Sequence, residues 1–411
     1  MVTRKVVTLA ACPLKENMMK VVHLDGLLRA GIDFAAWNVC EAIHGKFISH
    51  GDSSCPDREH DIPSVAAFEE ALDKENLDQT LFLAFIGYEY ATAALFQALR
   101  RRGAVIGYLE NMSWHEYGDL PRWQRLWLRA RNPLSFLTFL RKKMSRTRFG
   151  NANAGYDVVF YESAARRPKE CSLAVPVNSV LYEEAMLSES QTPYADGPYA
   201  VYLDTAMGAH PDVLQYTNVY PSGTEYRASL IAFFDRIERD LGVKVVIAAH
   251  PKANYRGDEF AGRPILRQQT CALVRGAQLA LSDGSTSTLY AVALGKPVIF
   301  ILNDCLLRWC RAVGRECPIF AAIPLLQARR AEALGMPLLH IDKCSAKPLQ
   351  WPQVNIKKYQ QECLNWLSHP GMENVKSEKI FLDALQQLDI AQLRQPAANL
   401  IDMKQQQPCR N

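Results

Sequence analysis

The chain has 411 residues, of which 48% are hydrophobic and 22% charged, and its formal net charge is +4. This length is enough for two domains with cores of their own, and the composition is that of an ordinary globular protein. The small net charge and the lack of a zinc-finger or RNA-binding signature exclude nucleic acid as an expected partner.

The cysteines and the apolar runs indicate a cytoplasmic location. The 11 cysteines are scattered without the CxxC spacing of a zinc site, so we expect reduced thiols and no metal. The apolar run at residues 6–10 is too short for a secretory signal with a cleavage site. No run of about twenty apolar residues is present that could cross a membrane.

The amino-terminal half of the chain alternates apolar runs with amphipathic segments. We expect strands at residues 6–11, 32–39, 80–86, 104–109, 156–162 and 172–175, and helices at residues 16–29, 64–77 and 92–102. This alternation is typical of a parallel sheet with helices on its faces.

Three charged residues follow expected strands of this half. Ligands bind beyond the carboxyl ends of parallel strands, so Lys15, Glu89 and Glu110 are candidate residues on the side of an acceptor substrate. A solvated turn explains Lys15 equally well, and either glutamate could simply cap a helix.

Residues 113–150 interrupt the alternation with aromatic residues, many cations and few acids. The aromatic residues are Trp114, Trp123, Trp127, Phe136 and Phe139, and the cations are Arg122, Arg125, Arg129, Arg131, Arg141, Lys142, Lys143, Arg146 and Arg148. A helix of this kind can lie on a membrane, with its apolar side among the headgroups and its cations on anionic lipid. Contact with the inner face of the cytoplasmic membrane is therefore one expectation. The alternative is a helix packed on the domain with solvated arginines.

A linker rich in glycine, proline and polar residues, at residues 191–198, marks the expected domain boundary. We expect an amino-terminal domain at residues 1–195 and a second domain at residues 196–350. Residues 351–396 are expected to form terminal helices that pack back toward the first domain. The glutamine-rich tail at 397–411 has the composition of a disordered segment.

The second domain has polar motifs at expected strand ends. We expect strands at residues 199–203, 245–249, 278–281 and 297–302, and helices at 225–241 and 289–294. We expect the last three strands to be neighbours in a parallel sheet. His250-Pro251-Lys252 follows the strand at 245–249, and the turn Asp283-Gly284-Ser285-Thr286-Ser287-Thr288 follows the strand at 278–281.

Together, these motifs predict a phosphate site. A Ser/Thr-rich turn before a helix offers backbone N–H groups, hydroxyl donors and the positive end of the helix dipole. His250 would donate a further hydrogen bond to the same phosphate. The alternatives are that the Ser/Thr turn is only an N-cap and that His-Pro is only a turn.

The His250-Pro251 pair, the turn at 285–287 and the strand entry Gly295-Lys296-Pro297-Val298 resemble the carboxyl-terminal half of GT-B glycosyltransferases. The resemblance is to bacterial enzymes that use CMP-activated acidic sugars, namely sialyl- and polysialyltransferases and the β-Kdo transferases of capsule and O-antigen synthesis. It implies an α/β fold with two Rossmann-like domains that face a central cleft and a C-terminal helix that crosses back. In the N-terminal half, only the pattern of elements is similar.

In the resembled families, the HP and Ser/Thr motifs hold the CMP phosphate and cytosine, and a carboxylate upstream of HP takes part in the chemistry. The matching donor-side residues are His250, Asp283, Ser285, Thr286 and Ser287. Lys252, Tyr255 and Arg263 follow the HP pair and could meet the phosphate or carboxylate of the donor.

Asp204, directly after the strand at 199–203, is the candidate catalytic carboxylate because strand ends are rigid. The acid-acid-glycine triplet that is usual in the resembled families is absent, so Asp212 stays an alternative. An Asx-turn that opens the loop would explain Asp204 without catalysis.

If the donor is a CMP-sugar, the leaving group is CMP, which carries a single phosphate. Fixed hydrogen-bond donors can stabilise the negative charge that develops on this phosphate without a cofactor or metal. No DxD triplet occurs, which argues against a metal-dependent GT-A enzyme. Asp204 would act either as a general base, giving inversion, or as a nucleophile, giving retention. Resemblance to β-Kdo transferases implies retention, with a lipid-linked glycan as acceptor.

Three other functions stay open. A nucleotide-sugar epimerase or a CDP-glycerol-type phosphotransferase could use the same fold. A non-catalytic scaffold of a glycan-assembly complex would not need Asp204. A membrane-surface binding module would explain only the tryptophan- and arginine-rich segment.

Overall fold

The computed structural model describes the chain in twelve parts. They are residues 3–45, 53–88, 91–110, 114–130, 155–168, 171–188, 194, 196–207, 223–251, 253–314, 318–343 and 347–393. Lys252, Glu89 and Asp212 therefore lie outside the described residues, as do the tail at 397–411 and most of the basic segment.

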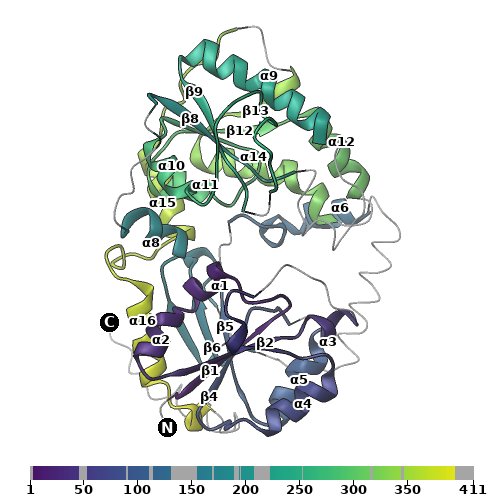
Figure 1. Cartoon of the computed structure of the whole chain (residues 1–411), viewed down its shortest axis with the longest axis vertical. Coiled ribbons are helices and arrows are strands. Elements are labelled where there is room, and N and C mark those ends of the chain that lie inside the picture. Colours follow the sequence, from purple (N-terminus) through teal and green to yellow (C-terminus); the bar gives the residue numbers. More distant parts are fainter. Residues whose placement is uncertain are drawn as a thin grey trace.

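The first domain is built on a seven-stranded parallel sheet of order β3-β2-β1-β4-β5-β6-β7 (Figure 1). Its strands are β1 (Lys5–Ala10), β2 (Asp33–Asn38), β3 (Glu59–Asp61), β4 (Thr80–Ala84), β5 (Val105–Leu109), β6 (Val158–Tyr161) and β7 (Leu173–Pro176). Consecutive residues of β1 alternate between two hydrophobic cores, one on each face of the sheet. Both faces are therefore covered, as a parallel sheet requires.

The helices of this domain are α1 (Glu16–Val21), α2 (Leu24–Arg29), α3 (Cys40–His44), α4 (Val65–Asp73), α5 (Ala93–Arg101) and α6 (Arg122–Ala130). The single helix expected at 16–29 is two short helices, because His23 has left-handed backbone geometry with φ of 51°. The nearest glycine, Gly26, lies inside α2 three residues after His23, so the sequence does not mark the position of the break.

The second domain has a six-stranded parallel sheet of order β10-β9-β8-β11-β12-β13. The strands are β8 (Tyr199–Leu203), β9 (Lys244–Ala248), β10 (Ile265–Leu266), β11 (Leu279–Ser282), β12 (Val298–Leu302) and β13 (Leu338–His340). Numbered within the domain, this is the Rossmann order 3-2-1-4-5-6. The expected adjacency of β9 and β11 is wrong, because the first strand of such a sheet lies at its centre and β8 separates them.

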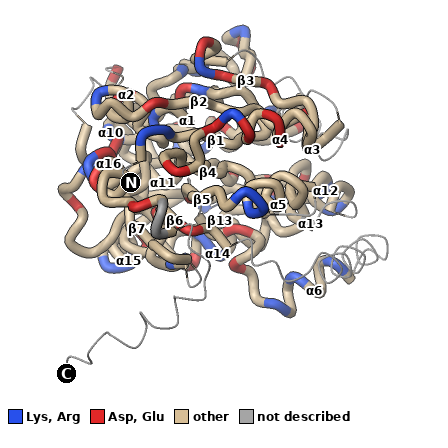
Figure 2. The backbone as a smooth tube through the Cα atoms, turned by 90° about the horizontal axis from the view of Figure 1, so that it is seen from below, with Lys and Arg blue, Asp and Glu red and all other residues tan. Residues whose placement is uncertain are grey.

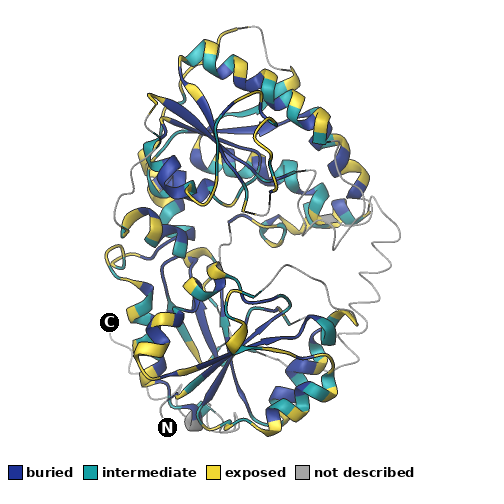
Figure 3. Ribbon diagram, viewed as in Figure 1, coloured by how far each residue is buried: buried dark blue, intermediate teal, exposed yellow. Residues whose placement is uncertain are grey.

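Most helices of the second half cover the faces of this sheet, whereas α16 and α17 return to the first domain. The helices of this half are α8 (Val180–Met186), α9 (Gly223–Leu241), α10 (Thr270–Gly276), α11 (Thr288–Ala293), α12 (Asp304–Val313), α13 (Pro318–Ala321), α14 (Ile323–Leu334), α15 (Ile356–Trp366), α16 (Ser377–Gln387) and α17 (Ile390–Leu393). Figure 3 shows the buried sheet between exposed outer helix faces. Helix α8 packs against α10 and α11, so it belongs to the core of the second domain.

The chain crosses back to the first domain after α15. Helix α16 packs against α2 and β7, and Phe381, Leu385 and Leu388 join the core of the first sheet. Two Rossmann-like domains with this return of the C-terminal helix form the GT-B arrangement, so the expected fold is confirmed.

Polar contacts fix the crossing. Trp114 Nε1 and His115 Nε2 lie 3.0 and 2.8 Å from Oε2 of Glu362 in α15. Ser163 Oγ, which follows β6, donates to the carbonyl of Asn365 at 2.7 Å. These side chains tie the first domain to the helices that cover the second.

Candidate functional site

The carboxyl ends of β8, β9 and β11 carry the candidate site. The strand order reverses between β8 and β11, and in sheets of this type ligands bind at that switch point. Asp204 follows β8, His250 follows β9 and the turn at 284–288 follows β11. Topology therefore brings Asp204 between the two motifs, a position that the sequence did not reveal.

Asp204 connects the ends of β8 and β9. Its Oδ1 accepts a hydrogen bond from the N–H of Ala206 at 2.9 Å, which is the Asx-turn of the alternative interpretation. Its Oδ2 accepts from the N–H of His250 at 3.0 Å and from the Tyr255 hydroxyl at 2.8 Å. Asp204 is only 5% exposed. These three hydrogen bonds fix the orientation of the carboxylate and link it to His250 and Tyr255, so this geometry supports a positioning role.

Asp283 lies beneath the turn instead of at its surface. It is 1% exposed, and its Oδ2 accepts hydrogen bonds from the Tyr202 hydroxyl at 2.6 Å, from Thr205 Oγ1 at 3.0 Å and from the Tyr226 hydroxyl. Burial raises its pKa to about 6, against the opposing effect of these hydrogen bonds. The side chain of Asp283 therefore joins the turn's first residue to β8 and α9, and its contact with the donor stays a prediction.

The Ser/Thr turn is closed by its own hydrogen bonds. Ser285 Oγ accepts from the N–H of Ser287 at 3.3 Å, and the Ser285 carbonyl accepts from the N–H and hydroxyl of Thr288 at 3.2 and 2.6 Å. Ser287 makes no side-chain cap, so it is not a simple N-cap. Among the described residues, the N–H groups of Ser285 and Thr286 have no hydrogen-bond partner and stay available at the tip of the turn.

Helix α14 supports the same turn from the side. Arg330 Nη1 donates to the Gly284 carbonyl at 3.2 Å. Gly284 has φ of +129°, and a Cβ there would lie 2.9 Å from Nε2 of Gln327, a fully buried residue. Both conditions require glycine. Sequence analysis missed Gln327 and Arg330 because nothing in the chain links α14 to a turn 40 residues earlier.

Arg263 forms ion pairs within the second domain. It is 8% exposed, and its guanidinium binds Glu238 at 2.7 and 3.0 Å and Asp235 at 2.6 Å, both in α9. It precedes β10, so it lies at the amino end of that strand, whereas ligands bind at carboxyl ends. The contact of Arg263 with the donor therefore gains no support from this placement and stays a prediction.

Tyr255 and Arg227 line the neighbourhood of Asp204. Burial and the charge of Asp204 raise the pKa of Tyr255, and the positive charge of Arg227 acts in the opposite direction. Arg227 lies in the first turns of α9 and is half-buried. Arg227 could not be predicted from the sequence. The spacing of apolar residues shows which side of α9 is buried, but not which edge of the sheet the start of α9 lies near.

The acceptor-side candidates have different environments. Glu110 is 7% exposed and accepts from the N–H of Ser163 at 3.2 Å, with Arg166 Nη1 3.7 Å away. It is a buried partner of the segment after β6, so its predicted role toward an acceptor is corrected. Lys15 is half-buried at the start of α1, next to the end of β1.

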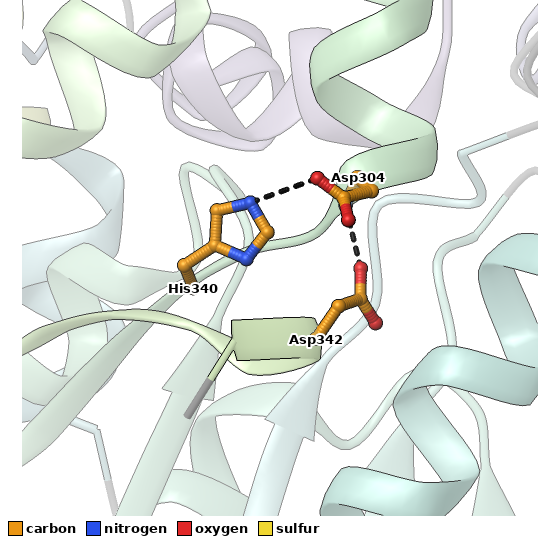
Figure 4. Close-up of side chains that lie close together, drawn as sticks. All are labelled: Asp304, His340 and Asp342. Atoms are coloured by element: carbon orange, nitrogen blue, oxygen red, sulfur yellow. Dashed lines mark hydrogen bonds and ion pairs between the residues drawn. The ribbon is translucent and has the colours of Figure 1, made fainter. Parts of the chain in front are cut away.

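Three potential metal ligands meet at the ends of β12 and β13 (Figure 4). The ligand atoms of Asp304, His340 and Asp342 lie within 4.8 Å of one another. Asp304 already binds His340 Nε2 at 3.1 Å and Lys343 Nζ at 3.2 Å, and Asp342 accepts from the N–H of Asp304 at 2.6 Å. These contacts satisfy the carboxylates and fix the start of α12 to β13, so we assign them a structural role.

A cavity of about 650 Å³ lies away from the strand ends, between residues 115–124 and helices α14 and α15. Its cations, Arg329 and Lys358, donate to the carbonyls of Asp119 and Glu332 at 3.1 and 3.0 Å. The cavity therefore belongs to the domain junction.

Among the helices that the structure describes, none is long and apolar enough to cross a membrane.

Comparison with known proteins found structures of low similarity. No family model matches the chain, and no curated protein does. One similar structure is the UDP-GlcNAc 2-epimerase from Methanocaldococcus jannaschii, with 12% identity, a TM-score of 0.45 and coverage of 93% of this chain and 100% of that chain. Another is the glycosyltransferase SnogD from Streptomyces nogalater, with 12% identity, a TM-score of 0.43 and coverage of 98% and 100%. Because these values are low, the fold assignment rests on the strand order and the path of α15 and α16.

Proposed function

We propose that the protein is a glycosyltransferase that moves an acidic sugar, of the Kdo or sialic acid type, from a CMP-sugar to a lipid-linked surface polysaccharide such as capsule or O-antigen. One observation carries the proposal. The motifs that resemble those of CMP-sugar enzymes follow β9 and β11, on either side of β8 at the switch point of the second sheet.

The environment suits a donor with one phosphate. His250 and the turn follow strands two positions apart, roughly 10 Å at the backbone, a gap that a phosphate and its attached sugar can fill. The N–H groups of Ser285 and Thr286 and the nearby hydroxyls are fixed donors toward the leaving phosphate. Arg227 is a nearby cation for the phosphate or for the carboxylate of an acidic sugar.

The working carboxylate is either Asp204 or Asp212. Asp204 accepts three hydrogen bonds, through which it sets the positions of His250 and Tyr255. Its replacement by asparagine would therefore disturb donor binding as well as transfer if its role is positioning. If Asp204 performs the chemistry, CMP binding survives and transfer is lost. Asp212 lies outside the described residues and is tested in parallel.

The direct experiment is a donor screen that measures free CMP. The full chain is incubated with CMP-Kdo, CMP-sialic acid, UDP-GlcNAc or CDP-glycerol, with and without a lipid-linked glycan acceptor. We expect CMP release from a CMP-sugar, increased by the acceptor. Epimerisation of UDP-GlcNAc or turnover of CDP-glycerol, without CMP release from either CMP-sugar, would reject the proposal in favour of the alternative enzymes.

The variants Asp204→Asn and Asp212→Asn locate the chemistry within the same assay. Asp258→Asn is the matched control, because this carboxylate is exposed in the connection between β9 and β10. We expect a loss of transfer in at least one of the two variants and none in the control. Full transfer by both variants would place the chemistry on another residue, whereas no transfer by the unaltered protein from any donor would favour a scaffold.

A further inference from the structure

Helix α6 turns its apolar side outward. Trp123, Leu126 and Trp127 are 66%, 51% and 48% exposed, whereas Leu128 is 3% exposed and packs with Leu120, Ala322 and Leu326. At 3.6 residues per turn, the three exposed side chains share one face and Leu128 points away from it. A surface helix normally buries its large apolar residues, so this helix has a face suited to a further apolar partner.

The cations of α6 border this face. Arg122, Arg125 and Arg129 occupy the side of the helix next to the exposed tryptophans. Figure 2 shows α6 at the edge of the molecule, with basic residues and no acidic residue along it. In the sequence, residues 120–156 contain nine Lys or Arg and no Asp or Glu. The partner is therefore expected to be both apolar and negatively charged.

We propose that the outward face of α6, formed by Trp123, Leu126 and Trp127 with the flanking Arg122 and Arg125, binds the surface of an anionic lipid bilayer. Tryptophan has a large apolar ring and one N–H donor, which suits it to the boundary between acyl chains and headgroups. The arginines would bind anionic headgroups at that depth.

A further exposed apolar residue, Ile319, lies in the helix next to α6. It belongs to α13, which packs against α6, and is 49% exposed. A helix anchored through Leu128 would present its apolar side at the membrane without leaving the domain. The proposal does not depend on the identity of the sugar donor, so the two can fail separately.

Two other occupants fit the charges less well. A second copy of the chain would bring the same basic segment to the contact, and like charges would repel. The C-terminal residues 394–411 contain one acid, Asp402, and three cations, so they offer no complementary charge either. Single-stranded nucleic acid is anionic and stacks on aromatic rings, but the aliphatic Leu126 and Ile319 offer it nothing.

The test is flotation of the full chain with lipid vesicles. We expect the protein to float with vesicles of phosphatidylcholine and phosphatidylglycerol, not with phosphatidylcholine alone, and to be released by salt. Replacing Trp123 and Trp127 by alanine should abolish flotation. Arg122→Gln with Arg125→Gln should weaken partitioning by about 25-fold, since each cation near an anionic surface contributes roughly a factor of five.

Trp351→Ala is the matched control, because Trp351 is also exposed, at 36%, but lies outside α6. All variants should keep the thermal unfolding profile and the CMP release of the unaltered protein, since the replaced side chains are exposed. Flotation that survives the double tryptophan substitution, or no flotation at all, overturns the proposal. Oligomerisation or binding of single-stranded RNA that is lost in the same variant, in place of flotation, also overturns it.

Discussion

The two sheets have the same strand order around their switch points, but the polar groups there are fixed to very different degrees. In the second domain, Asp204 and Asp283 accept hydrogen bonds from three tyrosine hydroxyls, from Thr205 and from two backbone N–H groups. In the first domain, apolar residues Phe85 and Ile86 follow β4. The buried hydroxyl of Thr8 in β1 has no hydrogen-bond partner among the described residues.

This difference shows that a repeated topology does not repeat a site. The strand order brings loops together in both sheets, but among the residues that the structure describes, the buried network of carboxylates and tyrosines lies at the switch point of the second sheet. Such a network suits a small, constant ligand such as a nucleotide. The less constrained edge of the first sheet suits a larger acceptor.

Replacing Gly284 by alanine should give the largest effect. The left-handed φ of +129° strains any side chain, and an added Cβ 2.9 Å from Gln327 Nε2 would force that side chain to shift, at a total cost of about 3 kcal/mol. The control in the first domain is Gly31→Ala, where φ is +72° and nothing lies within 4 Å of an added Cβ. There the cost should be about 1 kcal/mol. Urea unfolding measures both, and equal losses would contradict the contrast between the two domains.

The pH dependence of stability sharpens the comparison further. Because burial raises the pKa of Asp283 to about 6, the folded protein holds a proton there more tightly than the unfolded chain does. The stabilising effect is present below the unfolded value of 3.8 and is lost as pH rises to about 6, by up to about 3 kcal/mol. The variant Asp283→Asn should lack this decline.

Urea unfolding of both proteins at pH 4 and pH 7 measures this effect. The stability of Asp283→Asn relative to the unaltered protein should improve toward neutral pH by up to about 3 kcal/mol. Asp258→Asn, at an exposed position, serves as the control. Parallel pH profiles of the three proteins would show that the buried carboxyl does not titrate in this range.

Ligand binding separates the two switch points directly. His250→Ala should weaken CMP binding by about 10- to 100-fold, because a hydrogen bond to a charged phosphate contributes about 1.5–3 kcal/mol. Lys15→Ala should leave CMP binding unchanged and lower only transfer to the acceptor. Calorimetry with CMP and a transfer assay distinguish these outcomes. Weaker CMP binding in the Lys15 variant would mean that both sheets hold the nucleotide.

The sequence predicted the buried strands, because they are runs rich in valine and isoleucine, but it did not predict β3, β10 and β13, the short strands at the sheet edges. It also located Asp204, His250 and the Ser/Thr turn at strand ends. It could not show that β8 separates β9 from β11, since pairing depends on crossover connections. It could not show that Arg263 lies at the amino end of β10, since a charged residue near a motif can belong to either end of the next strand. Gln327 and Arg330 come from a helix whose position only the folded chain defines.

Helix α16 has a consequence for the order of events during synthesis. Phe381, Leu385 and Leu388 fill the core of a sheet whose strands end at Pro176. The ribosome must therefore add more than two hundred further residues before that sheet can be covered. Until then the nascent first half exposes an uncovered apolar face, which is where chaperones would be expected to bind.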